Sequence, residues 1–266
     1  MEPSRKLLAS DYDKTFFYKT AQDKLPANLE AVAQWQSENN LFVISTGRDA
    51  ASMLHERKTR HLSFDYLVSL NGSFIIDRHE NVLFKAAIPT HIAAELVSDL
   101  RIEFNDELIV SNGFDGCNLT NKEKSKTDSV AKEIFQRNST IYSRSIEESL
   151  NYDVFLIGCL TQNQEQATAV KKRIMDKFGR DLDVFINLNY INVVPKGISK
   201  ASGVNTILSH EEISKNDVVS IGDDLNDIPM IEEFNGYAVP NARPELIDAA
   251  QQTVDSVAEL IKMKLQ

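Results

Sequence analysis

Residues 6–15 read KLLASDYDKT, an apolar run that is followed at once by a polar cluster containing two aspartates. The run predicts a buried strand over residues 6–10. Similar apolar runs occur at residues 41–45 (LFVIS) and 66–70 (YLVSL). Segments with helical spacing of apolar residues separate these runs, over residues 25–39 and 50–59. Strands and helices therefore alternate as βαβαβ, which is typical of a parallel sheet covered by helices.

The pattern changes after Gly72. Short apolar segments at residues 73–76 and 81–85 flank a polar stretch, which favours a hairpin over a crossover. The chain then predicts helices over residues 90–104 and 162–178, and strands over residues 108–111, 153–160, 183–188 and 190–194. The first pattern resumes from Lys200, with helices over residues 200–208 and 227–233 and strands over residues 217–221 and 237–239.

We therefore expect an α/β fold with two domains. Residues 1–76 and 188–266 are predicted to form a Rossmann-like core with a parallel sheet. Residues 77–187 are predicted to form an inserted α+β domain. Lysines 122, 124 and 126 make a short basic stretch inside this insert. We interpret the stretch as a solvated loop, with phosphate binding as the alternative.

The composition is that of an ordinary globular protein. Of the 266 residues, 42% are hydrophobic and 26% are charged, and only 10 are glycine. These values exclude collagen-like chains, low-complexity disorder and small disulfide scaffolds. The formal net charge of −10 offers no basic surface, so we expect a small-molecule partner and neither nucleic acid nor membrane.

The cysteines and the N-terminal residues of the sequence indicate the cellular compartment of the protein. Cys117 and Cys159 are the only two cysteines in the sequence, and we expect them to pack as small apolar side chains. No signal peptide and no apolar stretch of membrane-spanning length is predicted. We therefore expect a cytoplasmic protein, and we expect it to be a monomer or a weak homodimer.

Polar clusters follow the predicted strands of the sheet where each strand ends. They are residues 11–15 (DYDKT), 45–49 (STGRD), 71–72 (NG) and 222–227 (GDDLND). Ligands of open α/β sheets bind outside the carboxyl ends of the strands. We therefore expect the four clusters to converge into one acidic site, although more than 200 residues separate the first from the last.

The residue types in these clusters indicate phosphoryl chemistry. Carboxylates packed closely together repel one another unless a cation holds them, and Mg²⁺ prefers such oxygen ligands. An aspartate at a strand end, Asp11, can attack phosphorus, and Asp13 is near enough to protonate the leaving oxygen. The charge of the transferring group also needs hydroxyl, amide and cationic partners, which Thr46, Gly47 and a lysine can provide.

Each motif also has a purely structural interpretation. Asp and Thr are common in turns and at helix starts, so D-x-D-x-T alone favours a structural role. The GDDLND stretch is more informative, because that many carboxylates in one turn oppose one another unless something binds them. A helix N-terminus can stabilise one or two of them. The order of the motifs and their positions after strands together favour the catalytic interpretation.

At this point the chain resembles the haloacid dehalogenase superfamily, and within it the Cof-like phosphatases with a type IIB cap. DYDKT resembles the first family motif, STGR the second, the region of Lys200 the third and GDDLND the fourth. The resemblance covers essentially the whole chain, since the insert at residues 77–187 occupies the place of the cap, which selects the substrate. It implies a Mg²⁺-dependent phosphoric monoester hydrolase that forms an aspartyl-phosphate.

The resemblance also implies roles for single residues. The catalytic roles fall on the nucleophile Asp11, the general acid and base Asp13, and the phosphate-holding residues Thr46 and Lys200. The Mg²⁺ site takes the carboxylate of Asp11, the main-chain carbonyl of Asp13 and Asp223, with Asp227 in support. Asn226 contacts the phosphate side, and Arg48 and Asn71 edge the substrate crevice.

One position departs from the family pattern and one assignment needs a choice between two lysines. Lys14 stands where family members usually have glycine, which puts the substrate preference in question rather than the reaction.

Lys196 lies between Pro195 and Gly197, a turn context. Lys200 follows Ser199, a good N-cap residue, and begins a helix whose amide-rich end favours an anion. We therefore expect the phosphate to lie at Lys200.

The sequence thus predicts an enzyme that hydrolyses a small phosphorylated metabolite, such as a sugar phosphate or a phosphorylated cofactor. A phosphomutase or a sugar-phosphate-specific phosphatase on the same scaffold is the first alternative, since it would use the same residues. A regulatory protein that binds a phosphorylated metabolite without turnover is the second. A pure sensor has no need of both a nucleophile and an acid, which argues against this second alternative.

Overall fold

The computed structural model describes residues 4–19, 24–104, 108–115 and 145–265. These residues fall into two compact units. The first unit comprises Met1–Thr46, Arg60–Phe84 and Ser199–Gln266, and the second comprises Gly47–Thr59 and Lys85–Ile198. Cys117 and the lysines at 122, 124 and 126 lie outside the described residues.

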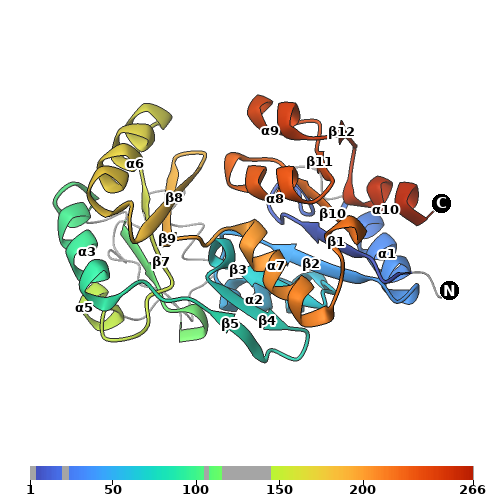
Figure 1. Cartoon of the computed structure of the whole chain (residues 1–266), viewed down its shortest axis with the longest axis horizontal. Helices are drawn as coiled ribbons and strands as arrows, with labels where there is room; N and C mark the ends of the chain where they lie inside the picture. The colour runs from blue at the N-terminus through green and yellow to red at the C-terminus, as the bar shows by residue number, and fades with distance from the viewer. Residues whose placement is uncertain (1–3, 20–23, 105–107, 116–144, 266) are drawn as a thin grey trace. The chain divides into compact units, whose positions relative to one another are not determined.

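An eight-stranded sheet forms the framework of the first unit (Figure 1). Its strand order is β12-β11-β10-β1-β2-β3-β4-β5. The strands are β1 (Leu7–Ser10), β2 (Leu41–Ser45), β3 (Tyr66–Ser69), β4 (Phe74–Asp77), β5 (Val82–Lys85), β10 (Val218–Gly222), β11 (Gly236–Ala238) and β12 (Gln252–Thr253). Neighbours from β12 to β3 pair in parallel, and β3 pairs with β4 antiparallel. The predicted parallel-sheet core is confirmed.

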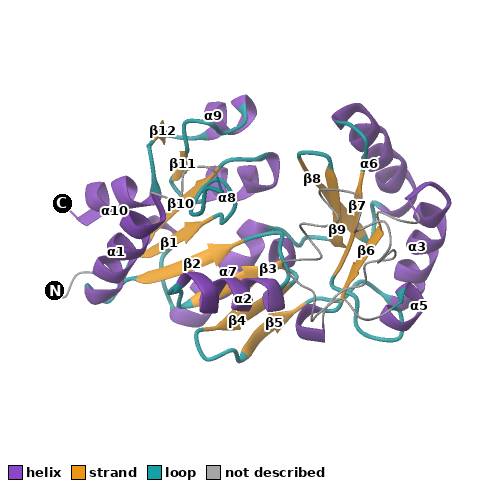
Figure 2. Ribbon diagram, turned by 180° about the vertical axis from the view of Figure 1, so that it is seen from behind, coloured by secondary structure: helices purple, strands orange, loops and turns teal. Residues whose placement is uncertain are grey.

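Helices cover both faces of this sheet (Figure 2). They are α1 (Lys24–Ser37), α7 (Lys200–Glu211), α8 (Ile228–Glu233), α9 (Pro244–Ala249) and α10 (Val257–Leu265). Side chains of a strand alternate between its faces. Leu7 and Val43 pack in one core with Val204 of α7. Phe42 turns to the opposite face, where its ring lies 5.3 Å from that of Phe16, and α1 packs beside α10.

The second unit has its own sheet and its own core. Its four strands pair antiparallel in the order β6-β7-β9-β8. They are β6 (Leu108–Ser111), β7 (Leu156–Leu160), β8 (Leu182–Asn187) and β9 (Tyr190–Pro195). The helices of this unit are α3 (Thr90–Phe104), α5 (Ile146–Ser149), α6 (Gln164–Phe178) and all but the last residue of α2 (Ala50–Arg60). Leu96 of α3, Ile157 of β7 and Val170 of α6 meet in one buried cluster.

Most predicted elements are present, with shifts at their ends. The strand predicted from residue 153 begins at Leu156. The helix predicted from residue 227 begins at Ile228, because the preceding residues form a separate turn of 3₁₀ helix. Cys159 is buried in the hydrophobic cluster of the second unit, in line with the expected apolar packing. Within the described ranges, no helix is both long enough and apolar enough to cross a membrane.

Helix α7 approaches the sheet closely at Gly203. A Cβ atom at this position would lie 2.4 Å from Cγ1 of Val68 and 3.3 Å from Cα of Gly72. Val68 is fully buried and β-branched, so its side chain has little freedom to move away. The glycine therefore lets α7, and with it Lys200 at the start of the helix, sit directly on β3.

Replacing Gly203 with alanine tests this close approach. Alanine favours a helix over glycine by ~1 kcal/mol, but overpacking a filled core costs ~1–3 kcal/mol. We expect the Gly203→Ala variant to lose up to ~2 kcal/mol in the free energy of unfolding, measured with urea. Ser209→Ala, at an exposed position of the same helix, is the control and should stay within ~0.5 kcal/mol of the wild type. A Gly203→Ala variant more stable than the wild type would contradict this close packing.

Candidate active site

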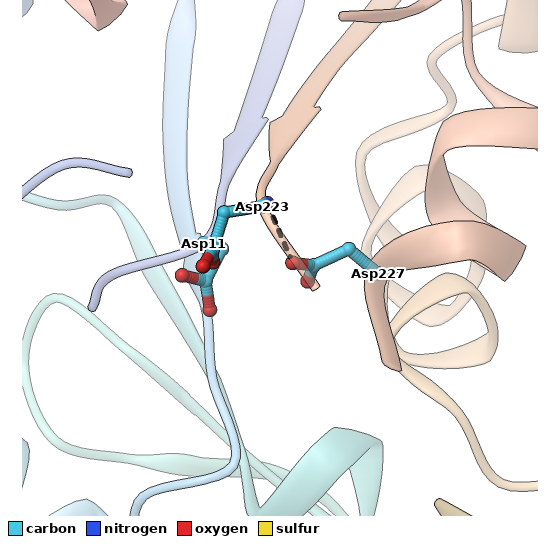
Figure 3. Close-up of side chains that lie close together, drawn as sticks. All are labelled: Asp11, Asp223 and Asp227. Atoms are coloured by element: carbon cyan, nitrogen blue, oxygen red, sulfur yellow. Dashed lines mark hydrogen bonds between the residues drawn. The ribbon is translucent and has the colours of Figure 1, made fainter. Parts of the chain in front are cut away.

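Two neighbouring strands bring Asp11 and Asp223 together. Asp11 follows β1 and Asp223 follows β10, and these strands pair in parallel with Ser10 opposite Ile221. The amide of Asp11 extends this pairing by donating to the carbonyl of Ile221 at 3.0 Å. One carboxylate oxygen each from Asp11, Asp223 and Asp227 lies within 4.8 Å of the other two (Figure 3). The predicted convergence of the first and last clusters is therefore present in the structure.

The loop after β10 is folded around the side chain of Asp227. Its Oδ2 accepts a hydrogen bond from the amide of Asp223 at 3.0 Å (Figure 3). It also accepts one from the amide of Asp224 at 3.1 Å. A Cβ atom on Gly222 would lie 2.6 Å from the Cβ of Asp227, so only glycine leaves room for this arrangement. Asp224 caps the following turn, where its carboxylate accepts from the amide of Leu225 at 2.7 Å. Neither the need for Gly222 nor the cap at Asp224 was among our predictions, although the D-x-x-D spacing of a capping box signals the cap.

Lys200 is the cation of this cluster. Its Nζ lies 2.6 Å from Oδ1 of Asp11 and also donates to Oδ1 of Asp227. The side chain is only 1% exposed. Ser199 caps the helix as predicted, since its hydroxyl accepts from the amide of Ser202 at 3.1 Å.

Lys196 has different surroundings. Its side chain is half exposed, and its Nζ lies 2.7 Å from Oδ1 of Asp183. Lys196 and Asp183 both belong to the second unit. The two lysines that the sequence left in competition therefore differ in burial and in partner, and Lys200 is the one placed beside Asp11.

The electrostatics of the cluster reflect burial among like charges. Burial raises the pKa of Asp11 to about 7, and the ammonium of Lys200 opposes this rise. Burial, then the carboxylates of Asp11 and Asp227, raise the pKa of Asp223 to about 9. Burial alone would lower the pKa of Lys200, but the carboxylates of Asp11 and Asp227 outweigh burial and raise it. The cluster thus holds more carboxylates than one ammonium can neutralise.

The donor set suits a divalent cation with a preference for oxygen. Both oxygens of Asp227 are engaged by amides or by Lys200, which makes Asp227 a support. Oδ1 of Asp11 meets Lys200, and Oδ1 of Asp223 accepts from the hydroxyl of Thr15 at 3.4 Å. The other carboxylate oxygens of Asp11 and Asp223 can therefore serve as ligands. Hard oxygen donors beside an excess of negative charge fit Mg²⁺.

Thr46, Asn71 and Asn226 meet at the neighbouring strand ends. The carbonyl of Thr46 accepts from the amide of Asn71 at 3.0 Å, and Nδ2 of Asn226 donates to Oδ1 of Asn71 at 3.0 Å. Nδ2 of Asn71 and Oδ1 of Asn226 are buried, and neither has a hydrogen-bond partner among the described residues. A buried donor and a buried acceptor are thus left open at this edge, where a water molecule or a ligand could pair with them.

The remaining predicted residues lie around these groups or in the other unit. Asp13 pairs with Phe17 in an isolated bridge. Lys14 has a φ of 61°, a left-handed backbone conformation that glycine adopts without cost. This conformation gives a physical reason for the glycine that family members usually have where this chain has Lys14. Gly47 and Arg48 belong to the second unit, where Nη1 of Arg48 lies 3.2 Å from Oε1 of Glu56.

A family model for haloacid dehalogenase-like hydrolases matches residues 8–260. The chain belongs to this family. The match confirms the resemblance inferred from the motifs and the predicted enzyme class, a hydrolase of the haloacid dehalogenase type.

Individual relatives cover nearly the whole chain. A Bacillus subtilis protein named 5-amino-6-(5-phospho-D-ribitylamino)uracil phosphatase YcsE is 24% identical over 96% of this chain and 90% of its own length. A haloacid dehalogenase-like hydrolase structure from B. subtilis aligns with a TM-score of 0.85 at 21% identity, covering 97% of this chain and 99% of its own. A sugar phosphatase of haloacid dehalogenase subclass IIB aligns with a TM-score of 0.80 at 21% identity, over 97% and 98% of the two chains. The structural alignments confirm the predicted fold class.

The raised pKa values predict that the stability of the hydrolase in chelator depends on pH. Folded Asp11 and Asp223 titrate at about 7 and about 9, whereas an unfolded aspartate titrates near ~3.9. Between these values the folded state binds more protons than the unfolded state, so stability falls as the pH rises. In chelator, the free energy of unfolding should therefore decrease from about pH 4 to about pH 9.

Urea unfolding at several pH values, with chelator or with saturating Mg²⁺, checks this expectation. Mg²⁺ should flatten the decline, because the cation replaces the protons. Asp223→Asn should flatten it between about pH 7 and 9 in chelator, where Asp223 titrates. Equal slopes with chelator and with Mg²⁺ would contradict a cation site at these carboxylates.

Proposed function

We propose that the protein is a Mg²⁺-dependent phosphatase that hydrolyses a small phosphomonoester, such as a sugar phosphate or a phosphorylated cofactor, through an aspartyl-phosphate. The observation that carries this proposal is the environment of Asp11. Its carboxylate stands at the end of a central strand, 2.6 Å from a fully buried ammonium and beside a second carboxylate, Asp223. The ends of neighbouring strands thus hold three groups that the reaction needs: a nucleophile in Asp11, an ammonium for the phosphate oxygens in Lys200, and a cation site at Asp11 and Asp223.

In the proposed reaction, Asp11 acts as the nucleophile and Asp13 transfers the protons. An oxygen of the Asp11 carboxylate attacks phosphorus, the bond to the leaving oxygen breaks, and Asp13 gives that oxygen its proton. Asp13 then takes a proton from water, whose oxygen attacks phosphorus and releases phosphate. The carboxylate of Asp11 is thereby restored. Mg²⁺, held by Asp11, Asp223 and the carbonyl of Asp13, would offset the negative charge of the phosphate.

The other polar groups of the clusters bind the substrate in this proposal. Thr46, Gly47 and Lys200 hold the phosphate oxygens, Asn226 and Asn71 lie beside them, and Arg48 edges the crevice. Asp227 supports the metal site by fixing Lys200 and the amide of Asp223. Two relatives support the substrate class, since one is named a phosphatase of a phosphorylated ribitylaminouracil and another a sugar phosphatase.

We assign substrate selection to residues 77–187 as a cap domain. Support comes from the second unit, which has a separate sheet and a hydrophobic core of its own. We place the enzyme in the cytoplasm, acting without nucleic acid or membrane, and as a monomer or weak homodimer.

Phosphate release from an aryl phosphate and from a panel of phosphorylated metabolites tests the proposal. Activity should vanish in chelator, return with Mg²⁺ and stay low with Ca²⁺, which tolerates looser coordination. Asp11→Asn should lose at least ~10³-fold in turnover, because an amide is a poor nucleophile. Asp248→Asn makes the same change at an exposed position and should leave turnover within about twofold. Full turnover in chelator, or an active Asp11→Asn variant, would refute the mechanism.

The two lysines provide a second test. Lys200→Ala removes the ammonium that would neutralise charge developing on the phosphate, and we expect turnover to fall on the order of 10²-fold or more. Lys196→Ala removes a half-exposed ion pair with Asp183 and should change turnover less than about tenfold. Circular dichroism should establish that both variants are folded. A reversed order of the two effects would move the phosphate site to Lys196.

A further inference from the structure

Arg60, the last residue of α2, places its guanidinium over the ring of Phe17. Cζ of Arg60 lies 4.0 Å from the ring centroid, well inside the ~6 Å over which a cation and an aromatic face attract each other. Both residues belong to the first unit, and Phe17 is buried. Neither residue belongs to the four polar clusters of the sequence. The contact therefore joins the end of α2 to the segment that follows β1.

The backbone of Phe17 closes the turn that carries Asp13. The amide of Phe17 donates to the carbonyl of Tyr12 at 2.8 Å, and the amide of Lys14 donates to the carbonyl of Phe17 at 2.8 Å. These two bonds engage the residues directly before and after Asp13, which itself pairs with Phe17 in the isolated bridge. We call residues 11–17 the Asp13 turn. The position of Asp13 thus depends on where Phe17 lies.

The Asp13 turn is anchored in the core at Phe16 and strained at Lys14. Phe16 is fully buried, and its carbonyl accepts a hydrogen bond from Nδ2 of Asn28 at 2.8 Å. Lys14 is exposed and has the left-handed φ of 61°, which is unfavourable for a residue with a Cβ atom. Such a conformation persists only where surrounding contacts hold it. The turn therefore needs contacts beyond its own two hydrogen bonds.

The ring of Phe17 makes contacts of this kind. It stacks on the buried ring of Tyr12, with centroids 5.7 Å apart and planes 16° apart, and it lies against the guanidinium of Arg60. A guanidinium is planar and weakly hydrated, so it suits stacking on an aromatic face. The side chain of Arg60 thus ties the Asp13 turn to a helix that is distant in sequence.

We propose that Arg60 is a positioning residue for Asp13: by stacking on Phe17 it keeps the Asp13 turn closed and holds the Asp13 carboxyl group at the leaving oxygen. Arg60 acts through the turn and touches neither substrate nor metal in this proposal. The inference rests on the proposed function, in which Asp13 gives the leaving oxygen its proton. A general acid contributes ~10²–10⁴-fold to a reaction, and a displacement of about 1 Å can remove much of such a contribution.

The test measures kcat/KM in saturating Mg²⁺ for two aryl phosphates that differ in their need for an acid. The leaving group of 4-nitrophenyl phosphate departs readily as an anion, whereas that of phenyl phosphate is more basic and depends on protonation. kcat/KM reports phosphoryl transfer to Asp11, the step in which the leaving oxygen departs. Asp13→Asn removes the acid and should therefore lose much more activity with phenyl phosphate than with 4-nitrophenyl phosphate.

Arg60→Met keeps the apolar stem of the side chain and removes the guanidinium. Its kcat/KM should fall about tenfold with phenyl phosphate and less than about twofold with 4-nitrophenyl phosphate. Phe17→Leu should show the same difference, and the double variant should be no worse than either single variant, because both remove one contact. Arg60→Lys retains a cation for the ring and should lose less than Arg60→Met does.

Arg5→Met is the matched control. Arg5 is also a partly exposed arginine of the first unit, and its guanidinium pairs with Glu211. Its replacement removes a structural contact away from the Asp13 turn, so kcat/KM should stay within about twofold of the wild type with both substrates. Circular dichroism should establish that each variant is folded. If Arg60→Met does not fold, Arg60→Lys and Phe17→Leu decide the test.

Three outcomes would overturn the inference: wild-type rates in Arg60→Met, an equal loss with the two substrates, or additive losses in the double variant. An equal loss would assign Arg60 to phosphate binding or to general stability. The proposed function stands in each case if Asp13→Asn shows its larger loss with phenyl phosphate. If Asp13→Asn treats the two substrates alike, the role of Asp13 in the proposed function fails, and the inference fails with it.

Discussion

The arrangement of the first unit depends on one buried ammonium, that of Lys200, between two carboxylates. Lys200 comes from the start of α7, Asp11 from the end of β1, and Asp227 from the loop after β10. Removing a lysine from water is unfavourable, and its two carboxylate partners offset that penalty only where all three side chains meet. Loss of one partner from such a buried group typically costs ~3–5 kcal/mol. The charges therefore link three distant segments of the chain at one place.

The geometry of the cluster is set by the protein itself. The amides of Asp223 and Asp224 hold Asp227, and the absence of a side chain at Gly222 gives Asp227 its space. Close packing at Gly203 seats α7, and with it Lys200, against β3. These contacts fix the acceptors before any ligand binds, so ligand binding does not have to pay for ordering them. The remaining excess of negative charge is what a cation would relieve.

The sequence predicted the sheet and the convergence of its polar clusters because apolar runs and strand ends are local features. The sequence also favoured Lys200 over Lys196 as the phosphate-binding lysine, because Ser199 before Lys200 marks the start of a helix. The ends of several elements were off by one to three residues, as for the strand that begins at Leu156. Three tertiary details had no local signal: the space at Gly222, the engagement of both Asp227 oxygens and the close approach at Gly203. The division into domains at residues 76 and 188 and the role of each site residue stay predictions.

The backbone that carries Asn71 is strained. Leu70, Asn71 and Gly72 have φ values of 50°, 53° and 106°, and a left-handed conformation costs roughly 1–2 kcal/mol at each residue other than glycine. This backbone presents the Asn71 side chain to Asn226. Exchanging O and N in both amides would preserve the bond between them and still leave one donor and one acceptor unpaired. A phosphate oxygen satisfies the donor, but a phosphate dianion has no proton for the acceptor. Under the proposed function, the pair would therefore be complementary to a phosphate accompanied by a hydroxyl group or a water molecule.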